Sequence, residues 1–118
     1  MSRASDPFVT HVLELLSGLG PCRARPMFGG YGIYLGERMI GLIAWERLYL
    51  KTDAQTRQAF SAAGGEPFVH EAKGRPITMA YLEPPSEALD DAELMRPWAR
   101  LALEAALRAP SGKRVRGR

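Results

Sequence analysis

The stretch Arg25-Pro26-Met27-Phe28-Gly29-Gly30-Tyr31-Gly32-Ile33-Tyr34 decides the fold, because it places three glycines in a run that otherwise has the composition of a β-strand. Glycine weakens a strand unless the bare backbone is needed for a bend or a close approach. We therefore expect a packed helix, a partner chain or a ligand to lie close to the sheet at this point.

Short apolar runs around this stretch predict an antiparallel meander, with strands over residues 30–35, 39–44 and 47–51. Gly36-Glu37 and Trp45-Glu46 form its two-residue turns. Glycine suits the first position of a type II′ turn, whereas Trp-Glu is a poor turn pair. A second hairpin is expected further along, with strands near residues 67–71 and 76–82 around a turn at Lys73-Gly74.

Three helices are predicted, over about residues 7–18, 53–63 and 90–109. Asp6 and Asp53 are good N-caps for the first two, and the spacing of Asp90 and Glu93 resembles a capping box for the third. Pro97 should either kink the third helix or begin a separate segment. The resulting order, α-β-β-β-α-β-β-α, predicts the α+β class.

Two-residue turns pair Gly32 with Gly41. Gly30, Gly32 and Gly41 then form a patch without side chains on one face of the meander, which we call the glycine floor. The same face carries large apolar side chains, namely Tyr34, Met39, Ile43, Leu48 and Leu50. The other face carries Tyr31, Ile33, Leu35, Ile40, Leu42 and Tyr49, with Arg47 and Lys51. A sheet that is apolar on both sides needs cover on both. We expect the long C-terminal helix on the glycine floor, and keep self-association or a ligand pocket as alternatives.

The length of 118 residues fits a single domain, expected over residues 1–109, followed by a basic, disordered tail over 110–118. The tail explains the net charge of +3, because it contains Lys113, Arg114, Arg116 and Arg118; the rest of the chain has 12 basic and 13 acidic residues. Any nucleic-acid contact is therefore expected from the tail, and to be weak.

Localisation is expected to be cytoplasmic. The N-terminus has no apolar core of the kind that a secretory signal needs, and no apolar run reaches the roughly 18 residues of a membrane span. The single cysteine, Cys22, agrees with a reducing compartment.

No catalytic site, metal site or cofactor is predicted. His11 and His70 lack metal-ligand spacing, and a strand rather than a helix follows the glycine run, which excludes a phosphate-binding loop. Arg23 would lower the pKa of the adjacent Cys22, although an incidental thiol is the better interpretation. Asp90 and Asp91 are interpreted as helix caps.

A binding site near the glycine floor is the remaining candidate. Its residues combine cations and aromatic rings with bare backbone: Arg25, Phe28, Gly29, Gly30, Tyr31, Gly32, Gly41, Tyr49 and Lys51. Arg23 lies near the same floor. Solvated charges at strand ends are the simpler interpretation of Arg23, Arg25 and Lys51.

Five motifs resemble the TfoX N-terminal domain family over about residues 6 to 109, namely 25–34, 42–51, Pro67-Phe68, 79–81 and 97–99. The family is named for TfoX/Sxy, regulators of bacterial natural competence that are thought to act with the cyclic AMP receptor protein at competence promoters. The resemblance implies an α+β fold in the order α, three strands, α, two strands, α, and supplies no catalytic residue.

Two departures from the family stand out. Full-length competence regulators carry a second, C-terminal domain, which this sequence does not include, so competence activation is not carried over. The turn usually written Asp-Gly is Gly36-Glu37 here, and Trp45 occupies the next turn.

We predict a non-enzymatic regulatory or interaction module that binds protein through its sheet surface. A transcription factor of the cyclic AMP receptor protein type is the candidate partner, and a homodimer is a further expectation. The alternatives are a sensor for a small anionic ligand or an unrecognised enzyme at the glycine-lined surface, and weak nucleic-acid binding by the tail.

Overall fold

A computed structural model describes residues 6–27, 29–72 and 75–109. The helical elements are α1 (Pro7–Leu15), the 3-10 turn η2 (Ser17–Leu19), α2 (Arg57–Ala62), the 3-10 turn η3 (Ser86–Asp90) and α3 (Ala92–Arg108). The strands are β1 (Cys22–Met27), β2 (Gly30–Leu35), β3 (Arg38–Ala44), β4 (Arg47–Lys51), β5 (Pro67–Ala72) and β6 (Arg75–Leu82). The predicted α+β class is confirmed. Among the described residues, no helix is long and apolar enough to cross a membrane.

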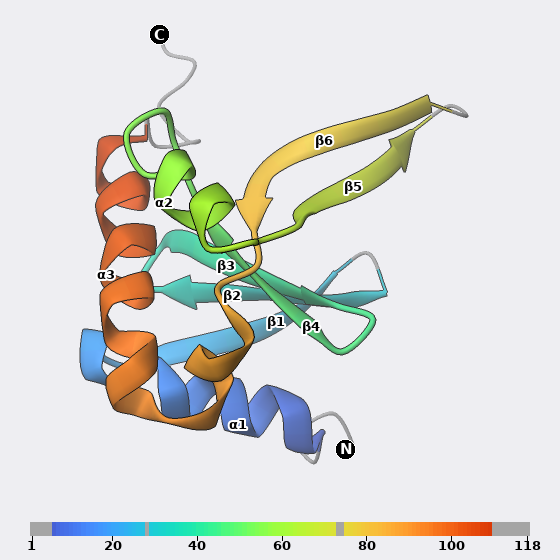
Figure 1. Ribbon diagram of the computed structural model, residues 1–118. Helices are drawn as coiled ribbons and strands as arrows, with labels where there is room; N and C mark the ends of the chain where they lie inside the picture. Colours follow the sequence, from blue (N-terminus) through green and yellow to red (C-terminus); the bar gives the residue numbers. More distant parts are fainter. Residues whose placement is uncertain (1–5, 28, 73–74, 110–118) are drawn as a thin grey trace, which may run out of the picture.

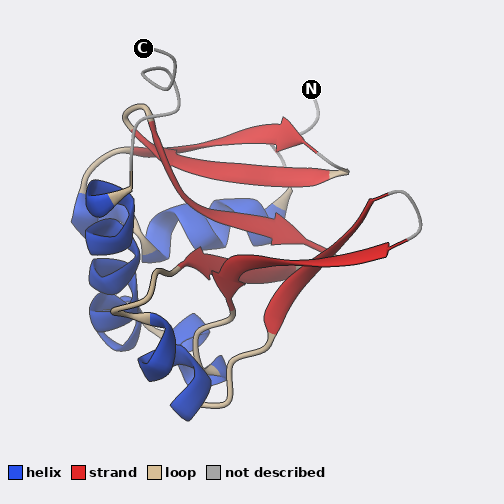
Figure 2. Cartoon of the chain, turned by 90° about the horizontal axis from the view of Figure 1, so that it is seen from above, coloured by secondary structure: helices blue, strands red, loops and turns tan. Residues whose placement is uncertain are grey.

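All six strands form one antiparallel sheet in the order β1-β2-β3-β4-β6-β5. The helices lie along one side of it (Figures 1 and 2). Only two residue pairs, Leu50–Leu82 and Lys51–Tyr81, join β4 to β6. Beyond that short junction the β5–β6 hairpin diverges from the other strands as an arm (Figure 1).

Strand β1 was not predicted, so four strands rather than three separate α1 from α2. The segment Cys22–Met27 contains no β-branched or aromatic residue, and composition therefore gave no strand signal. It lies at the edge of the sheet, where Arg23, Arg25 and Pro26 are well placed. Charged side chains and proline at an edge discourage pairing with another chain.

The register between β2 and β3 differs from the prediction at one point. Leu35 pairs with Arg38 and Tyr34 with Met39, as expected, but a bulge between Ile33 and Tyr34 shifts the remaining pairs. Gly41 consequently faces Ile33, and Gly32 faces Leu42. The predicted Gly32–Gly41 pair is wrong, because a one-residue shift moves every later side chain to the other face.

The main core lies between the sheet and the helices. Its buried members from the sheet are Ile33, Ile40, Ile43, Leu48, Leu50 and Leu82, and those from the helices include Val12, Phe60, Met95, Ala99 and Ala102. Small residues on the inner side of α3 allow this helix to approach the strands closely. The Nη1 of Arg38 on β3 donates to the carbonyl of Ala106 at 2.9 Å. The helix α3 covers the face that carries Gly41, Leu48 and Leu50, whereas Gly30 and Gly32 lie on the opposite face. The expectation that this helix lies on a floor made by all three glycines is therefore wrong, although it does cover one face of the sheet.

The helix ends follow capping chemistry, with two corrections. Asp6 caps α1 by accepting from the backbone N–H groups of Phe8 and Val9. The cap of α3 is Asp91, one residue later than predicted, which accepts from the N–H of Glu93 at 2.9 Å. Pro97 lies inside α3 and does not begin a separate segment.

Candidate binding surface

The face of the sheet turned away from the helices carries alternating side chains from several strands. We call this surface the helix-free face; it includes Arg23, Arg25, Met27, Gly30, Gly32, Tyr34, Met39, Leu42, Tyr49, Lys51, Phe68 and Tyr81. Four of these side chains, those of Leu42, Tyr49, Phe68 and Tyr81, form a second buried cluster between β3, β4 and the arm. The sheet itself therefore buries part of the apolar surface on this side, which a sheet apolar on both faces needs to have covered.

Three cations on the helix-free face lie over tyrosine rings. The Cζ atoms of Arg23 and Arg25 are each 5.5 Å from the Tyr34 ring centroid, and the Nζ of Lys51 is 5.3 Å from that of Tyr81. These distances are within the range of cation–π attraction. The salt bridges among the described residues involve other cations, so no described carboxylate neutralises these three.

The tyrosine beneath Lys51 remains protonated. Burial, together with the phenol of Tyr34, raises the pKa of Tyr81 to about 12. Burial, followed by the charge of Glu83, also raises the pKa of Tyr49. The helix-free face thus combines cations with neutral phenols, an arrangement that attracts anions.

Trp45 stands at the rim of this face and is 71% exposed. Its ring lies 5.7 Å from that of Phe68, which in turn lies 5.3 Å from that of Tyr49. Trp45 and Glu46 have φ angles of 54° and 58°, so the predicted two-residue turn is made entirely by left-handed non-glycine residues. That conformation costs about 1–2 kcal/mol per residue. Such strain is concentrated at functional positions in proteins.

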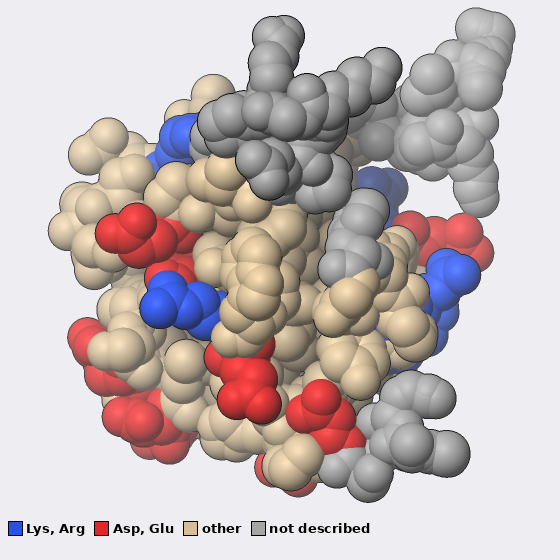
Figure 3. Space-filling view, turned by 90° about the vertical axis from the view of Figure 1, so that its right-hand side faces the viewer, with Lys and Arg blue, Asp and Glu red and all other residues tan. Residues whose placement is uncertain are grey.

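Figure 3 views the molecule from the side towards which the arm and the β3–β4 turn project. Uncharged side chains fill the centre of this view, Lys and Arg side chains lie on both flanks, and acidic side chains lie on the same flanks and along the lower part (Figure 3). The surface is therefore not uniformly basic, and its positive charge is local.

The structure brings together five of the predicted binding residues on the helix-free face, namely Arg25, Gly30, Gly32, Tyr49 and Lys51. Tyr31 packs against the main core instead, and Gly41 pairs with Ile33 and Leu50 of that core. The predicted floor of three glycines is therefore wrong, because the bulge between β2 and β3 puts Gly41 on the other face.

The predicted glycines have different surroundings, and some predicted residues are not described. Gly29 lies in the turn between β1 and β2 with a φ of 77°, and a Cβ at Gly30 would collide with the backbone carbonyl of Ile43. A Cβ at Gly32 would lie 2.9 Å from the Cε of Met27, so the bare backbone there makes room for neighbouring side chains of the same face. Phe28, the turn residues Lys73 and Gly74, and the tail cations Lys113, Arg114, Arg116 and Arg118 are outside the described residues.

The sequence indicates Arg23, with Arg25 and Lys51, as a candidate for a small cationic site, with solvated strand-end charges as the preferred interpretation, whereas it does not select Tyr34 or Tyr81 for the binding site. The alternation of Arg23 and Arg25 is a period-two signal that, had β1 been recognised as a strand, would have placed both on one face. Their position over Tyr34 depends on the pairing of β1 with β2, in which Arg23 faces Tyr34. The position of Tyr81 beside Lys51 depends on the short β4–β6 junction, which no local pattern indicates.

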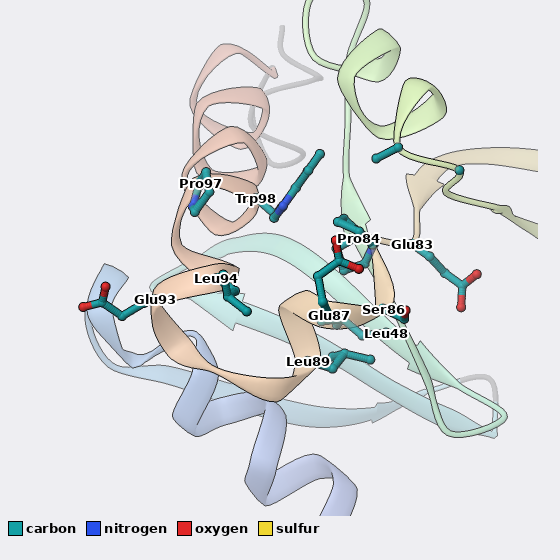
Figure 4. A pocket seen from close by; sticks show the side chains of 13 residues that line it. Leu48, Glu83, Pro84, Ser86, Glu87, Leu89, Glu93, Leu94, Pro97 and Trp98 are labelled. Carbon is teal, nitrogen blue, oxygen red and sulfur yellow. The ribbon is translucent and has the colours of Figure 1, made fainter.

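A pocket of about 660 Å³ lies on another part of the molecule, between α3, η3 and the segment before it (Figure 4). Glu83, Glu87 and Glu93 belong to its lining. The carboxylates of Glu83 and Glu93 point away from the space between Leu94 and Pro84, in opposite directions (Figure 4). They do not converge as an acid–base pair would.

The pocket is better interpreted as a packing seam. Glu83 pairs with Arg47 at 3.4 Å and Glu93 with Arg96 at 3.8 Å, so both carboxylates already have a cation. The Trp98 ring lies edge to face against Phe60, with centroids 4.9 Å apart, and thus joins α3 to α2.

The remaining titratable candidates have structural environments. Partial burial raises the pKa of Cys22, so the possibility that Arg23 activates this thiol is contradicted. The Nε2 of His11 donates to the carbonyl of Leu89 at 2.7 Å and ties α1 to η3. Within the part of the chain that the structure describes, no three His, Cys, Asp or Glu side chains gather to hold a metal ion.

The observed architecture defines an α+β domain with one helical layer and a six-stranded sheet whose second face is a candidate binding surface. The sequence matches the family model of the TfoX N-terminal domain over residues 14–106, which is most of its length. The chain therefore belongs to the TfoX N-terminal domain family, as the motifs predicted. A search of curated proteins gave no match.

Proposed function

We propose that this chain is a non-enzymatic regulatory module that binds a protein partner through the helix-free face of its sheet. One observation carries the proposal. All three helices contribute to the core on the opposite face, whereas the helix-free face keeps three cations that no described carboxylate neutralises. Arginine and aromatic residues are the types enriched where protein interfaces bury surface.

The exposed rim supports the same surface. Trp45 is large, apolar and held in a costly backbone conformation, and folding gains little from a side chain that remains 71% exposed. Burying such a ring against a partner would recover the hydrophobic free energy that the isolated chain leaves unused. A partner seated on the helix-free face would contact Trp45.

Family membership supports a regulatory role. The class of partner that we propose is a cytoplasmic transcription factor of the cyclic AMP receptor protein type, which the resemblance implies for competence regulators. Association of two copies through this face is the homodimer alternative.

A sensor for a small anionic molecule is the second candidate function. It is favoured by the same three cations, because Arg23, Arg25 and Lys51 lie over the rings of Tyr34 and Tyr81 and have no described counter-ion. A small anion would need only these groups, whereas a protein partner would also cover Trp45.

Site-specific photo-crosslinking in cells of the native host tests the proposal. Benzoylphenylalanine placed at Trp45 should give, on irradiation, a covalent adduct of higher mass that contains a second protein. The matched control is the same residue at Leu107, an exposed apolar position on α3 and therefore on the helical side. It should give no adduct.

Mass spectrometry of the adduct distinguishes binding of a different protein from association of two copies of the chain. A different protein supports partner binding, and a second copy of the chain supports the homodimer. Adducts formed only from position 107, or from neither position, would contradict the proposal.

A further inference from the structure

We infer that the helix-free face recognises an acidic segment of a protein, and that Arg23, Arg25 and Lys51 bind its carboxylates. The inference rests on the proposed function and adds the chemistry of the partner. It follows from how the strands arrange these three cations and from what surrounds them.

The sheet gathers the cations around one pair of rings. Strand pairing sets Arg23 beside Tyr34 and Lys51 beside Tyr81, and Arg25 is the next residue on the same side of β1. Tyr34 and Tyr81 lie on the same face of the sheet. The positive groups therefore lie on one face, although they come from β1 and β4.

The rings also hold the cations in a useful orientation. A guanidinium that lies over an aromatic face keeps the N–H groups at its edge available, and these groups match the two oxygens of a carboxylate. Arg23 uses one of its N–H groups on the carbonyl of Gly36, at 3.3 Å. The side chains of Arg25 and Lys51 donate no hydrogen bond to a described residue, so their N–H groups remain for a ligand.

The aromatic residues favour a protein over a single-stranded nucleic acid. Bases stack on open ring faces. Tyr49 and Tyr81 are only 4% and 7% exposed, and Phe68 is equally buried. These rings are thus covered by their own neighbours and have no open face for a base.

The charge distribution points the same way. Outside the tail cations, the chain carries 12 basic and 13 acidic residues, and acidic side chains lie among the Lys and Arg side chains in Figure 3. A long polyanion with one charge per nucleotide would meet these carboxylates. A short segment with a few carboxylates can contact the three local cations without being repelled by the acidic side chains elsewhere on the surface.

Fluorescence anisotropy with a labelled hexaglutamate peptide tests the inference on the full chain. The peptide should bind at low ionic strength. The variant Arg23→Gln/Arg25→Gln/Lys51→Gln should lose affinity by about tenfold or more, because each charge-assisted contact disappears. The single variants Arg25→Gln and Lys51→Gln should each weaken binding, and they decide the outcome if the triple variant does not fold.

The matched control removes three positive charges from the helical side instead, in the variant Arg57→Gln/Arg96→Gln/Arg100→Gln. All three side chains are exposed on α2 or α3. This variant should bind the peptide nearly as well as the wild type, and any contribution of the tail is common to both triple variants. Equal losses in the two triple variants would overturn the inference, since binding would then depend only on net charge.

Two further probes separate the possible anions. A labelled oligothymidine that binds more tightly than the peptide, and loses affinity in the same face variants, would replace the acidic segment with a nucleic acid. Inorganic phosphate that displaces the peptide more strongly than chloride at equal ionic strength would replace it with a small anion. Either result would overturn the inference.

The outcome is distinguishable from failure of the proposed function. If hexaglutamate does not bind but the crosslink from position 45 persists, only the acidic chemistry is wrong. If the crosslink is absent, the protein-binding role itself fails.

Discussion

At the scale of single residues, the glycines of the central stretch serve separate purposes. Gly32 leaves room on the helix-free face for Met27, whose Cε would lie 2.9 Å from an added Cβ. At Gly30 the obstacle would be backbone, the carbonyl of Ile43. A flexible side chain can move at little cost, whereas a paired strand cannot. The close approach expected from the sequence is thus real, but at Gly30 the element that approaches is the neighbouring strand.

Replacing Gly30 with alanine should lower the free energy of unfolding by about 2–3 kcal/mol, because β2 and β3 must separate to admit the methyl group. Urea denaturation monitored by circular dichroism measures the loss. The control is Gly18→Ala in η2, where nothing lies within 4 Å of the added Cβ and φ is not positive. It should be neutral or stabilising by up to about 1 kcal/mol. A Gly30→Ala variant as stable as Gly18→Ala would contradict this role.

At the scale of elements, short-range chemistry was readable from the sequence and pairing between strands was not. Asp6 caps α1 as predicted, because a cap needs only its immediate neighbours. The prediction that Asp53 caps the second helix is wrong: Asp53 accepts from the N–H groups of Gln55 and Thr56 in the turn before α2, and Thr56 is the N-cap residue. Strand β1 escaped prediction because its residues have little strand preference and its pairing with β2 defines it. The bulge beside Ile33 likewise depends on the partner strand. These two features decide which residues share the helix-free face.

The end of α3 is tied to the start of the α2 region by an ion pair between Arg108 Nε and Asp53 Oδ2, 2.7 Å apart. The hydrogen bond from Arg108 lowers the pKa of Asp53 from 3.8 to about 2. A lowered pKa in the folded state means that the contact stabilises the fold above about pH 4 and is lost as the pH falls towards 2. Asp53→Asn keeps the oxygen that accepts from Gln55 and Thr56 but removes the charge.

Wild type should therefore unfold at a higher temperature than Asp53→Asn at neutral pH, and the difference should disappear between about pH 4 and pH 2. Calorimetry at a series of pH values measures it. Asp90→Asn, at an exposed carboxyl without an ion pair among the described residues, should show no such difference. A gap between wild type and Asp53→Asn that stays constant with pH would assign the effect to the hydrogen bonds from Gln55 and Thr56 rather than to the ion pair.

At the scale of the whole molecule, one layer of helices closes one face of the sheet, and the curl of the arm closes part of the other (Figure 1). Composition and periodicity predicted the class, most of the elements and a sheet that is apolar on both sides. They also selected Arg25 and Lys51 as binding residues. The rest of the cluster required tertiary information, because Tyr34 and Tyr81 share a face only after β2, β3, β4 and β6 have assembled.

The central claim is that the helix-free face is the surface that binds an acidic partner. Amide chemical-shift mapping of the full chain during a titration with hexaglutamate tests it most directly. The shifted signals should lie in β1, β2, β4 and β6, around Arg23, Tyr34, Lys51 and Tyr81. Shifts confined to the seam between α3 and η3, or to residues 110–118, would contradict it.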